Sequence, residues 1–142
     1  MMKRIYYLLL LITLSVRVYA PGDGAIPLPE PAELNPYVDI WEAVCWVESR
    51  HNAEAINVAE QAYGIAQIRQ CKLNDYNQAW RSDHDITDCH SPELSRKIFM
   101  WHCAQYESQD EAVRRWNGSG PATYEYLAMV RSRILSVQRG FK

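Results

Sequence analysis

The chain has 142 residues, 48% of them hydrophobic, with five tryptophans and nine tyrosines. This is enough for one small domain with a single core and too little for a second domain. The first 20 residues hold three basic side chains, and the rest of the chain has 12 basic against 17 acidic residues, a formal net charge of −5. Such an acidic balance argues against nucleic acid as a partner.

Residues 1–20 have the pattern of a secretory signal peptide. Lys3 and Arg4 precede an apolar run over residues 5–16, and small residues end the segment at Ala20. The run is short for a membrane span, so we expect cleavage and export to the periplasm or the extracellular space. A cut nearer Gly24, or retention of the segment as a membrane anchor, stays open. Residues 21–34 are predicted to be a linker, because they are rich in Pro, Gly, Ala and Glu, and a domain is expected over 35–138.

A helix is predicted over residues 36–49, opened by Asn35-Pro36. One face of this helix holds residues spaced by three and four: Val38, Trp41, Val44, Cys45 and Glu48. Glu48 therefore continues a core-facing stripe. Burial disfavours the ionised form of a carboxyl group and raises its pKa, which suits a general acid near neutral pH. The alternative is a buried glutamate held by a structural arginine.

An irregular or short β segment is predicted over residues 54–69. Small, apolar and polar residues alternate from Ala62 to Ile68 around a single glycine, Gly64. A glycine in such a segment is typical of a backbone that approaches another part of the structure closely. Gln67 is the polar side chain that this segment would present.

The remaining chain is predicted to be helical near 72–80, 92–107, 110–117 and 121–137. Ser91-Pro92 is a good helix start, and the turn from Asn117 to Pro121 places glycines after one helix and proline before the next. The expected buried faces of the second and fourth of these helices are Leu94, Ile98 and Trp101, and Leu127, Val130 and Ile134, with Tyr126 beside the latter.

Four cysteines in an exported chain favour two disulfides over free thiols. They are Cys45, Cys71, Cys89 and Cys103. Cys45 with Cys103 and Cys71 with Cys89 is the preferred pairing, and pairing of Cys89 with Cys103 stays open. A zinc site is the alternative, because His90 and His102 adjoin two of the cysteines. Neighbouring helical residues point about 100° apart, so His102 and Cys103 are poorly placed to share one tetrahedral site, and no metal is expected.

Four short motifs occur along the chain in this order: Glu48-Ser49, Gly64-Ile65-Ala66-Gln67-Ile68, Trp116-Asn117-Gly118 and Tyr126-Leu127-Ala128-Met129-Val130. Their order and spacing resemble those of the lytic transglycosylase (SLT-type) domain of the lysozyme superfamily. The resemblance covers about residues 36–135. The family usually has Gly-Leu-Met-Gln at Gly64 to Gln67, and Ala-Tyr-Asn at Arg115 to Asn117. The resemblance implies a mainly α (α+β), lysozyme-like fold, a single helical domain with the short irregular or β segment beside the catalytic helix.

The resemblance also implies a reaction and a role for each motif residue. Glu48 would protonate the oxygen of the β-1,4 bond between N-acetylmuramic acid and N-acetylglucosamine and then act as a base, so that the C6 hydroxyl closes onto C1 in a 1,6-anhydro product. Ser49 would help to place the substrate, Gln67 and Asn117 would bind sugar amide or hydroxyl groups, and Tyr126 would hydrogen-bond the catalytic carboxyl group. No cofactor is implied.

The acidic residues agree with a route that uses one carboxyl group. Most glycosidases need a second carboxylate across the sugar. Here Asp75, Asp83, Asp85 and Asp88 lie in a polar stretch predicted to be a solvated loop, and their spacing marks none of them as a partner for Glu48.

Two other functions stay open beside the transglycosylase. One is a lysozyme, in which water replaces the C6 hydroxyl group. The other is a catalytically idle glycan-binding or assembly protein that keeps the fold. The expected partner is the glycan strand of peptidoglycan and the expected state is a monomer, and a protein partner in cell-envelope assembly stays open.

Overall fold

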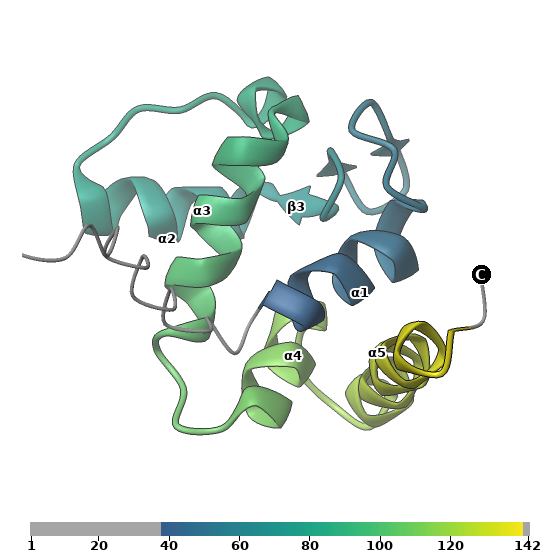
Figure 1. Cartoon of the computed structure of the whole chain (residues 1–142). Coiled ribbons are helices and arrows are strands. Elements are labelled where there is room, and N and C mark those ends of the chain that lie inside the picture. The colour runs from purple at the N-terminus through teal and green to yellow at the C-terminus, as the bar shows by residue number, and fades with distance from the viewer. Residues whose placement is uncertain (1–37, 141–142) are drawn as a thin grey trace, which may run out of the picture. The chain divides into compact units, whose positions relative to one another are not determined.

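The computed structural model describes residues 38–140, and helices dominate them (Figure 1). The predicted signal peptide (1–20), the predicted linker (21–34) and the predicted helix start at Asn35-Pro36 lie outside the described residues. The helices are α1 (Val38–Ser49), α2 (Gln70–Trp80), the 3-10 helix η1 (Ile86–His90), α3 (Pro92–Cys103), α4 (Gln109–Asn117) and α5 (Ala122–Gln138). The prediction of a mainly α fold with a short β segment is confirmed.

A small antiparallel sheet follows α1. Its strands are β1 (Ile56–Asn57), β2 (Ala62–Tyr63) and β3 (Ile68–Arg69), in the order β1-β2-β3. Ile56 pairs with Tyr63, and Tyr63 pairs with Ile68. Because β3 continues directly into α2, the sheet connects the end of α1 to the start of α2.

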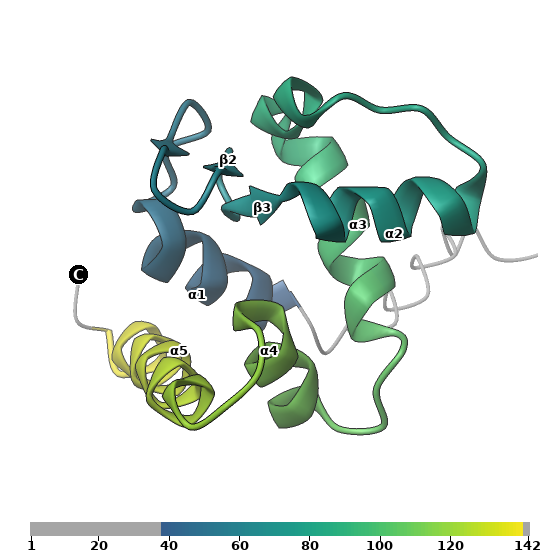
Figure 2. The ribbon, with the colours of Figure 1, turned by 180° about the vertical axis from the view of Figure 1, so that it is seen from behind.

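The core forms where α1 packs against the other helices. The predicted stripe residues Trp41, Val44 and Cys45 are buried. The ring of Trp41 contacts Phe99 of α3 at a centroid distance of 5.4 Å, and Phe99 contacts Trp116 of α4 at 5.1 Å. Helix α5 packs against both α1 and α4, as the view from behind shows (Figure 2). The C-terminal end of α1 therefore lies between the sheet and α5.

Gly64 allows the predicted close approach of two backbones. Its φ of +78° is unfavourable for a residue with a side chain. A Cβ atom at this position would lie 1.9 Å from the carbonyl oxygen of Cys89 in η1. The segment between β2 and β3 can rest against η1 because it carries glycine here.

The buried face of α5 differs from the prediction. Thr123, Tyr126 and Val130 are buried, whereas Leu127 and Ile134 are only partly buried. Tyr126 therefore belongs to the core face, because α5 is rotated so that this residue points toward α1. The sequence pattern identified only apolar residues as the buried face. A tyrosine can also be buried when its hydroxyl group has a hydrogen-bond partner inside the core.

The region between α2 and α3 holds more structure than predicted. Asp75 lies within α2, in agreement with the helix predicted near 72–80, so its assignment to a solvated loop is wrong. Asp85 caps η1, because its carboxylate accepts from the backbone N–H of Thr87 and its own N–H donates to Asp88. Helix α3 begins at Pro92 as predicted, with Ser91 accepting from the N–H of Leu94, but it ends at Cys103 rather than near residue 107.

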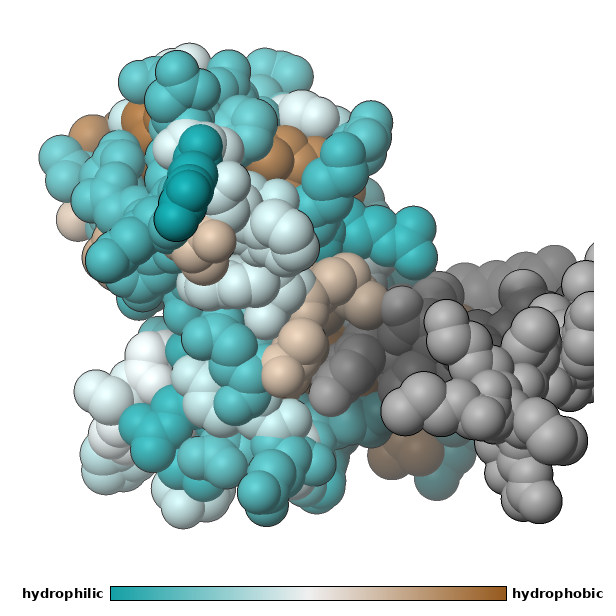
Figure 3. Space-filling model, turned by 90° about the vertical axis from the view of Figure 1, so that its left-hand side faces the viewer, coloured by the Kyte–Doolittle hydropathy of each residue, from teal (hydrophilic) through white to brown (hydrophobic). Residues whose placement is uncertain are grey.

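The described surface in Figure 3 is mainly hydrophilic, and its apolar residues are scattered rather than gathered. This agrees with a core that takes up most of the large apolar side chains. None of the described helices combines the length and the apolar composition that a membrane crossing requires.

Candidate active site

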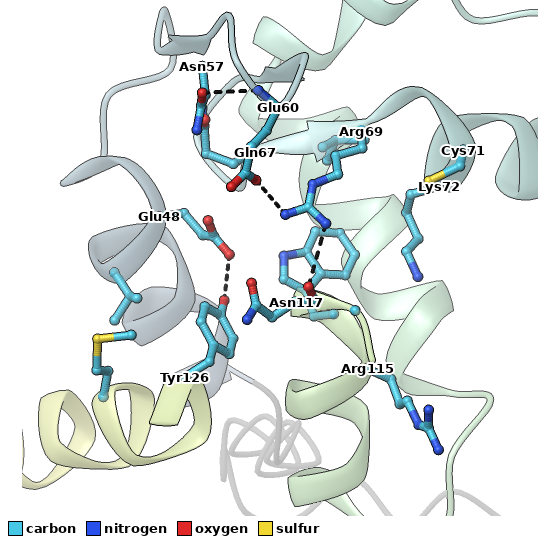
Figure 4. Close-up of a pocket in the computed structure, with 15 residues that line it drawn as sticks. Glu48, Asn57, Glu60, Gln67, Arg69, Cys71, Lys72, Arg115, Asn117 and Tyr126 are labelled. Atoms are coloured by element: carbon cyan, nitrogen blue, oxygen red, sulfur yellow. Dashed lines mark hydrogen bonds and ion pairs between the residues drawn. The ribbon is translucent and has the colours of Figure 1, made fainter. Parts of the chain in front are cut away.

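A pocket of about 320 Å³ opens at the C-terminal end of α1. Its wall is built from α1, the sheet, the start of α2, the end of α4 and one face of α5 (Figure 4). Four of the predicted site residues line it, namely Glu48, Gln67, Asn117 and Tyr126. The fold thus brings together residues that lie up to 78 positions apart in the chain.

Glu48 is the acidic group at the centre of this pocket. It is the penultimate residue of α1, and its Oε1 atom accepts a hydrogen bond of 2.6 Å from the hydroxyl group of Tyr126. Burial raises the pKa of Glu48 to about 7, although the hydrogen bond from Tyr126 and the charge of Arg69 lower it. A carboxyl group with this pKa is partly protonated at neutral pH, so it can both give and take a proton.

Tyr126 orients the carboxyl group of Glu48. Its side chain is 4% exposed, and burial followed by the charge of Glu48 raises its pKa well above the ordinary value. Tyr126 therefore keeps its proton and remains a donor. Because Oε1 accepts this bond, Oε2 is the oxygen left to carry a proton, and the second oxygen points into the pocket in Figure 4.

The sequence left open that Glu48 is a buried glutamate held by an arginine, but the contacts of Glu48 in the structure do not agree with this alternative. Among the described residues Glu48 forms no ion pair. The nearby arginine, Arg69, pairs with Glu60 and donates from Nη1 to the backbone oxygen of Asn117 at 3.5 Å. Arg69 thus joins the sheet to the end of α4, and the carboxyl group of Glu48 is held by the hydrogen bond from Tyr126.

Glu60 is a second carboxyl group in the pocket, and sequence analysis missed it. It follows β1, and its N–H donates to Oδ1 of Asn57 at 3.2 Å. Its side chain lines the same pocket as Glu48 and is held by Arg69 (Figure 4). Its negative charge contributes to the raised pKa of Glu48. The sequence could have indicated Glu60 as a pocket residue through its charge, which is opposite to that of Arg69, because a tight sheet brings their two segments together.

The donor groups of Ser49 and Gln67 hold the segment between β2 and β3. The hydroxyl group of Ser49 donates to the backbone oxygen of Ile65 at 2.8 Å, and Ser49 does not line the pocket. The amide nitrogen of Gln67 donates to the backbone oxygen of Gly64 at 3.0 Å. No hydrogen bond among residues 38–140 uses the side-chain oxygen of Gln67, so this oxygen can accept from a ligand in the pocket.

Asn117 reaches the pocket because α4 ends there. Gly118 follows it with a φ of +125°, which ends the helix as the sequence predicted. The preceding residue, Trp116, is buried, and its indole nitrogen donates to the backbone oxygen of Ala66 at 3.2 Å. Trp116 therefore ties the end of α4 to the same segment that Ser49 holds from α1.

The two predicted disulfides are not formed in this structure, where all four cysteines are free thiols. Cys45, Cys89 and Cys103 are buried in the apolar core, and Cys71 is exposed at the start of α2. Burial raises the pKa of Cys89 and of Cys103 to about 12, so these thiols stay protonated. The sequence argument used the oxidising environment of exported proteins, whereas the fold accommodates the three buried residues as small apolar side chains.

The histidines next to cysteines make other contacts, and Nδ1 of His90 lies 2.9 Å from the backbone oxygen of Ala53. Nε2 of His102 lies 2.9 Å from the backbone oxygen of Ala112, which can only accept, so this nitrogen carries the hydrogen. Nδ1 is then free to accept from the ammonium group of Lys72 at 3.0 Å. Within residues 38–140 no group of three or more His, Cys, Asp or Glu side chains is placed to hold a metal ion.

Comparison of this chain with models of known protein families, with curated proteins and with solved structures gives no match. The chemistry of the pocket therefore carries the functional argument.

Proposed function

We propose that this chain is an exported peptidoglycan lytic transglycosylase with a lysozyme-like fold. The observation that carries the proposal is the carboxyl group of Glu48, which lies in a pocket, is held by Tyr126 and has its pKa raised to about 7 by burial. The motif resemblance supports the same assignment, because its four predicted pocket residues converge on one site. The substrate is the β-1,4 bond between N-acetylmuramic acid and N-acetylglucosamine.

The reaction uses Glu48 twice. In the first step Oε2 gives its proton to the glycosidic oxygen as the bond from that oxygen to C1 breaks, and the acetamido group of the substrate stabilises C1. In the second step the C6 hydroxyl oxygen bonds to C1 and its proton passes to the carboxylate of Glu48. The 1,6-anhydro end forms, the acid is regenerated and no water is consumed.

The surrounding residues bind and orient the sugar. We assign the amide of Asn117 and the side-chain oxygen of Gln67 to hydroxyl or acetamido groups of the substrate. Tyr126 holds the carboxyl group so that its proton is carried on Oε2. Ser49, whose hydroxyl group is bonded to Ile65, acts by fixing the segment that carries Gln67.

The test compares wild-type protein with the Glu48→Gln variant on purified peptidoglycan. Wild type is expected to release soluble fragments, and Glu48→Gln is expected to release none because its amide cannot give up a proton. Glu42→Gln is the matched control, since Glu42 lies on the same helix with its side chain 64% exposed. Cleavage by Glu48→Gln at the wild-type rate would show that Glu48 is not the acid.

Glu60 favours a second candidate, a lysozyme-type hydrolase of the same bond. An inverting glycosidase has a second carboxylate in its active site, which acts as the base that activates water, and Glu60 is such a carboxylate in this pocket. Glu60→Gln separates the two mechanisms, with Glu54→Gln as the control for an exposed acid in the same region. A transglycosylase continues to form anhydro ends without Glu60, whereas the hydrolase loses its water-activating base and stops.

A further inference from the structure

A shallow groove between α1 and α5 continues from the candidate active site. We define this α1–α5 groove by Trp46, Val47, Arg50, Met129, Ser132 and Arg133. Val47 and Met129 line both the groove and the pocket that holds Glu48, so the two hollows meet at these residues. A substrate longer than the reacting sugars can therefore extend from the pocket into the groove.

Two arginines gather on one aromatic ring in this groove. The guanidinium carbon of Arg50 lies 3.3 Å from the ring centre of Trp46, and that of Arg133 lies 4.5 Å from the same ring centre. Stacking on an indole fixes each guanidinium plane while its N–H groups stay free to bind. Arg50 uses one of them on the backbone oxygen of Trp46, at 3.3 Å.

Neither arginine has an acidic partner within ion-pair distance among residues 38–140. Arg133 also borders a neighbouring hollow that contains Asp39 and Glu42, and Oε2 of Glu42 lies 3.9 Å from Nδ1 of His51. Two cations close to one ring repel each other, so an anion bound beside them stabilises the arrangement. A carboxylate suits the planar fork of a guanidinium group.

We propose that the α1–α5 groove binds the peptide stem of the peptidoglycan substrate, with Arg50 and Arg133 on a stem carboxylate. The inference rests on the proposed function, because N-acetylmuramic acid, which carries the stem, is one of the two sugars at the cleaved bond. The apolar side chains of Val47 and Met129 contact the stem between the pocket and the two arginines. The groove thereby selects glycan strands that carry peptides over bare strands.

The test measures binding without cleavage, using the full chain with Glu48→Gln. Calorimetric titration compares soluble glycan strands that carry peptide stems with the same strands after an amidase has removed the stems. We expect the stem-bearing strands to bind at least about tenfold more tightly. In the background of Glu48→Gln, the double variant Arg50→Gln and Arg133→Gln is expected to lose this preference.

The control removes two charges elsewhere. Arg81→Gln and Arg139→Gln alter exposed arginines outside the groove, and this protein is expected to keep the preference. Thermal unfolding of each variant verifies that it is folded. Equal affinity of the parent protein for both strands, or an unchanged preference in the groove variant, contradicts the inference. The proposed function is judged separately, because it depends on cleavage by wild-type protein and this titration does not.

Discussion

Replacing Glu48 by Gln should stabilise the protein at alkaline pH and not at acidic pH. Burial raises the pKa of Glu48 from 4.5 to about 7. Below pH 4.5 the carboxyl group is protonated in both the folded and the unfolded chain. As the pH rises through about 7, the unfolded chain has already lost the proton that the folded chain still holds, so the folded state loses stability relative to its value at low pH.

The size of the effect follows from the two pKa values. The difference between 4.5 and about 7 corresponds to about 3 kcal/mol of unfolding free energy, lost between those pH values. The amide of Gln has a similar shape, can accept from Tyr126 through its oxygen and does not ionise. The variant should therefore gain about 3 kcal/mol over wild type between pH 4 and pH 9.

The assay is urea unfolding of both proteins at pH 4 and at pH 9, with the difference between the two proteins taken at each pH. Other groups with shifted pKa values cancel in this difference, including His102, whose pKa is lowered to about 4 by burial and by Lys72. Cys45 and Tyr126, which feel the charge of Glu48, stay protonated because their pKa values are raised. If the difference in unfolding free energy between Glu48→Gln and wild type were the same at pH 4 and at pH 9, the account of Glu48 as a buried acid would be refuted.

Three further predictions concern the site and its supports. Tyr126→Phe removes a donor that lowers the pKa of Glu48, so the alkaline limb of the pH–activity profile should move up by about 1 pH unit, and a downward shift would contradict the assigned bond. Gly64→Ala should cost about 3 kcal/mol in urea unfolding, because of its φ and the clash with Cys89, and a loss well under 1 kcal/mol would contradict this contact. A thiol reagent should modify only Cys71 in the folded protein and four thiols after unfolding, whereas no thiols after unfolding would mean that both disulfides form.

The sequence predicted most of the helices, and the position of Glu48 at the end of the buried face of α1, because these signals are local. Spacings of three and four identify the buried face of α1, and the same spacing carries Glu48 to the end of that face. Gly64 was predicted at a close backbone approach from the residue type alone, and the contact with Cys89 bears this out. A capping serine before a proline located the start of α3.

The features of the site that the sequence did not predict depend on how segments distant in the chain pack together. Glu60 enters the pocket because two-residue strands pair in a particular register, and no period-2 pattern of useful length marks such strands. The rotation of α5 toward α1, which buries Tyr126, is set by packing against two helices at once. Arg50 and Arg133 meet on Trp46 from different helices, so their sequence positions gave no indication of a shared site.

The most direct test of the central claim is mass spectrometry of the fragments that wild-type protein releases from peptidoglycan in water enriched in oxygen-18. The account predicts 1,6-anhydro-muramyl ends that contain no oxygen from the solvent, because the C6 hydroxyl group of the substrate closes onto C1. Reducing ends that carry one solvent oxygen would contradict it and identify a hydrolase, and the absence of fragments from folded protein would leave the pocket as a glycan-binding site without cleavage.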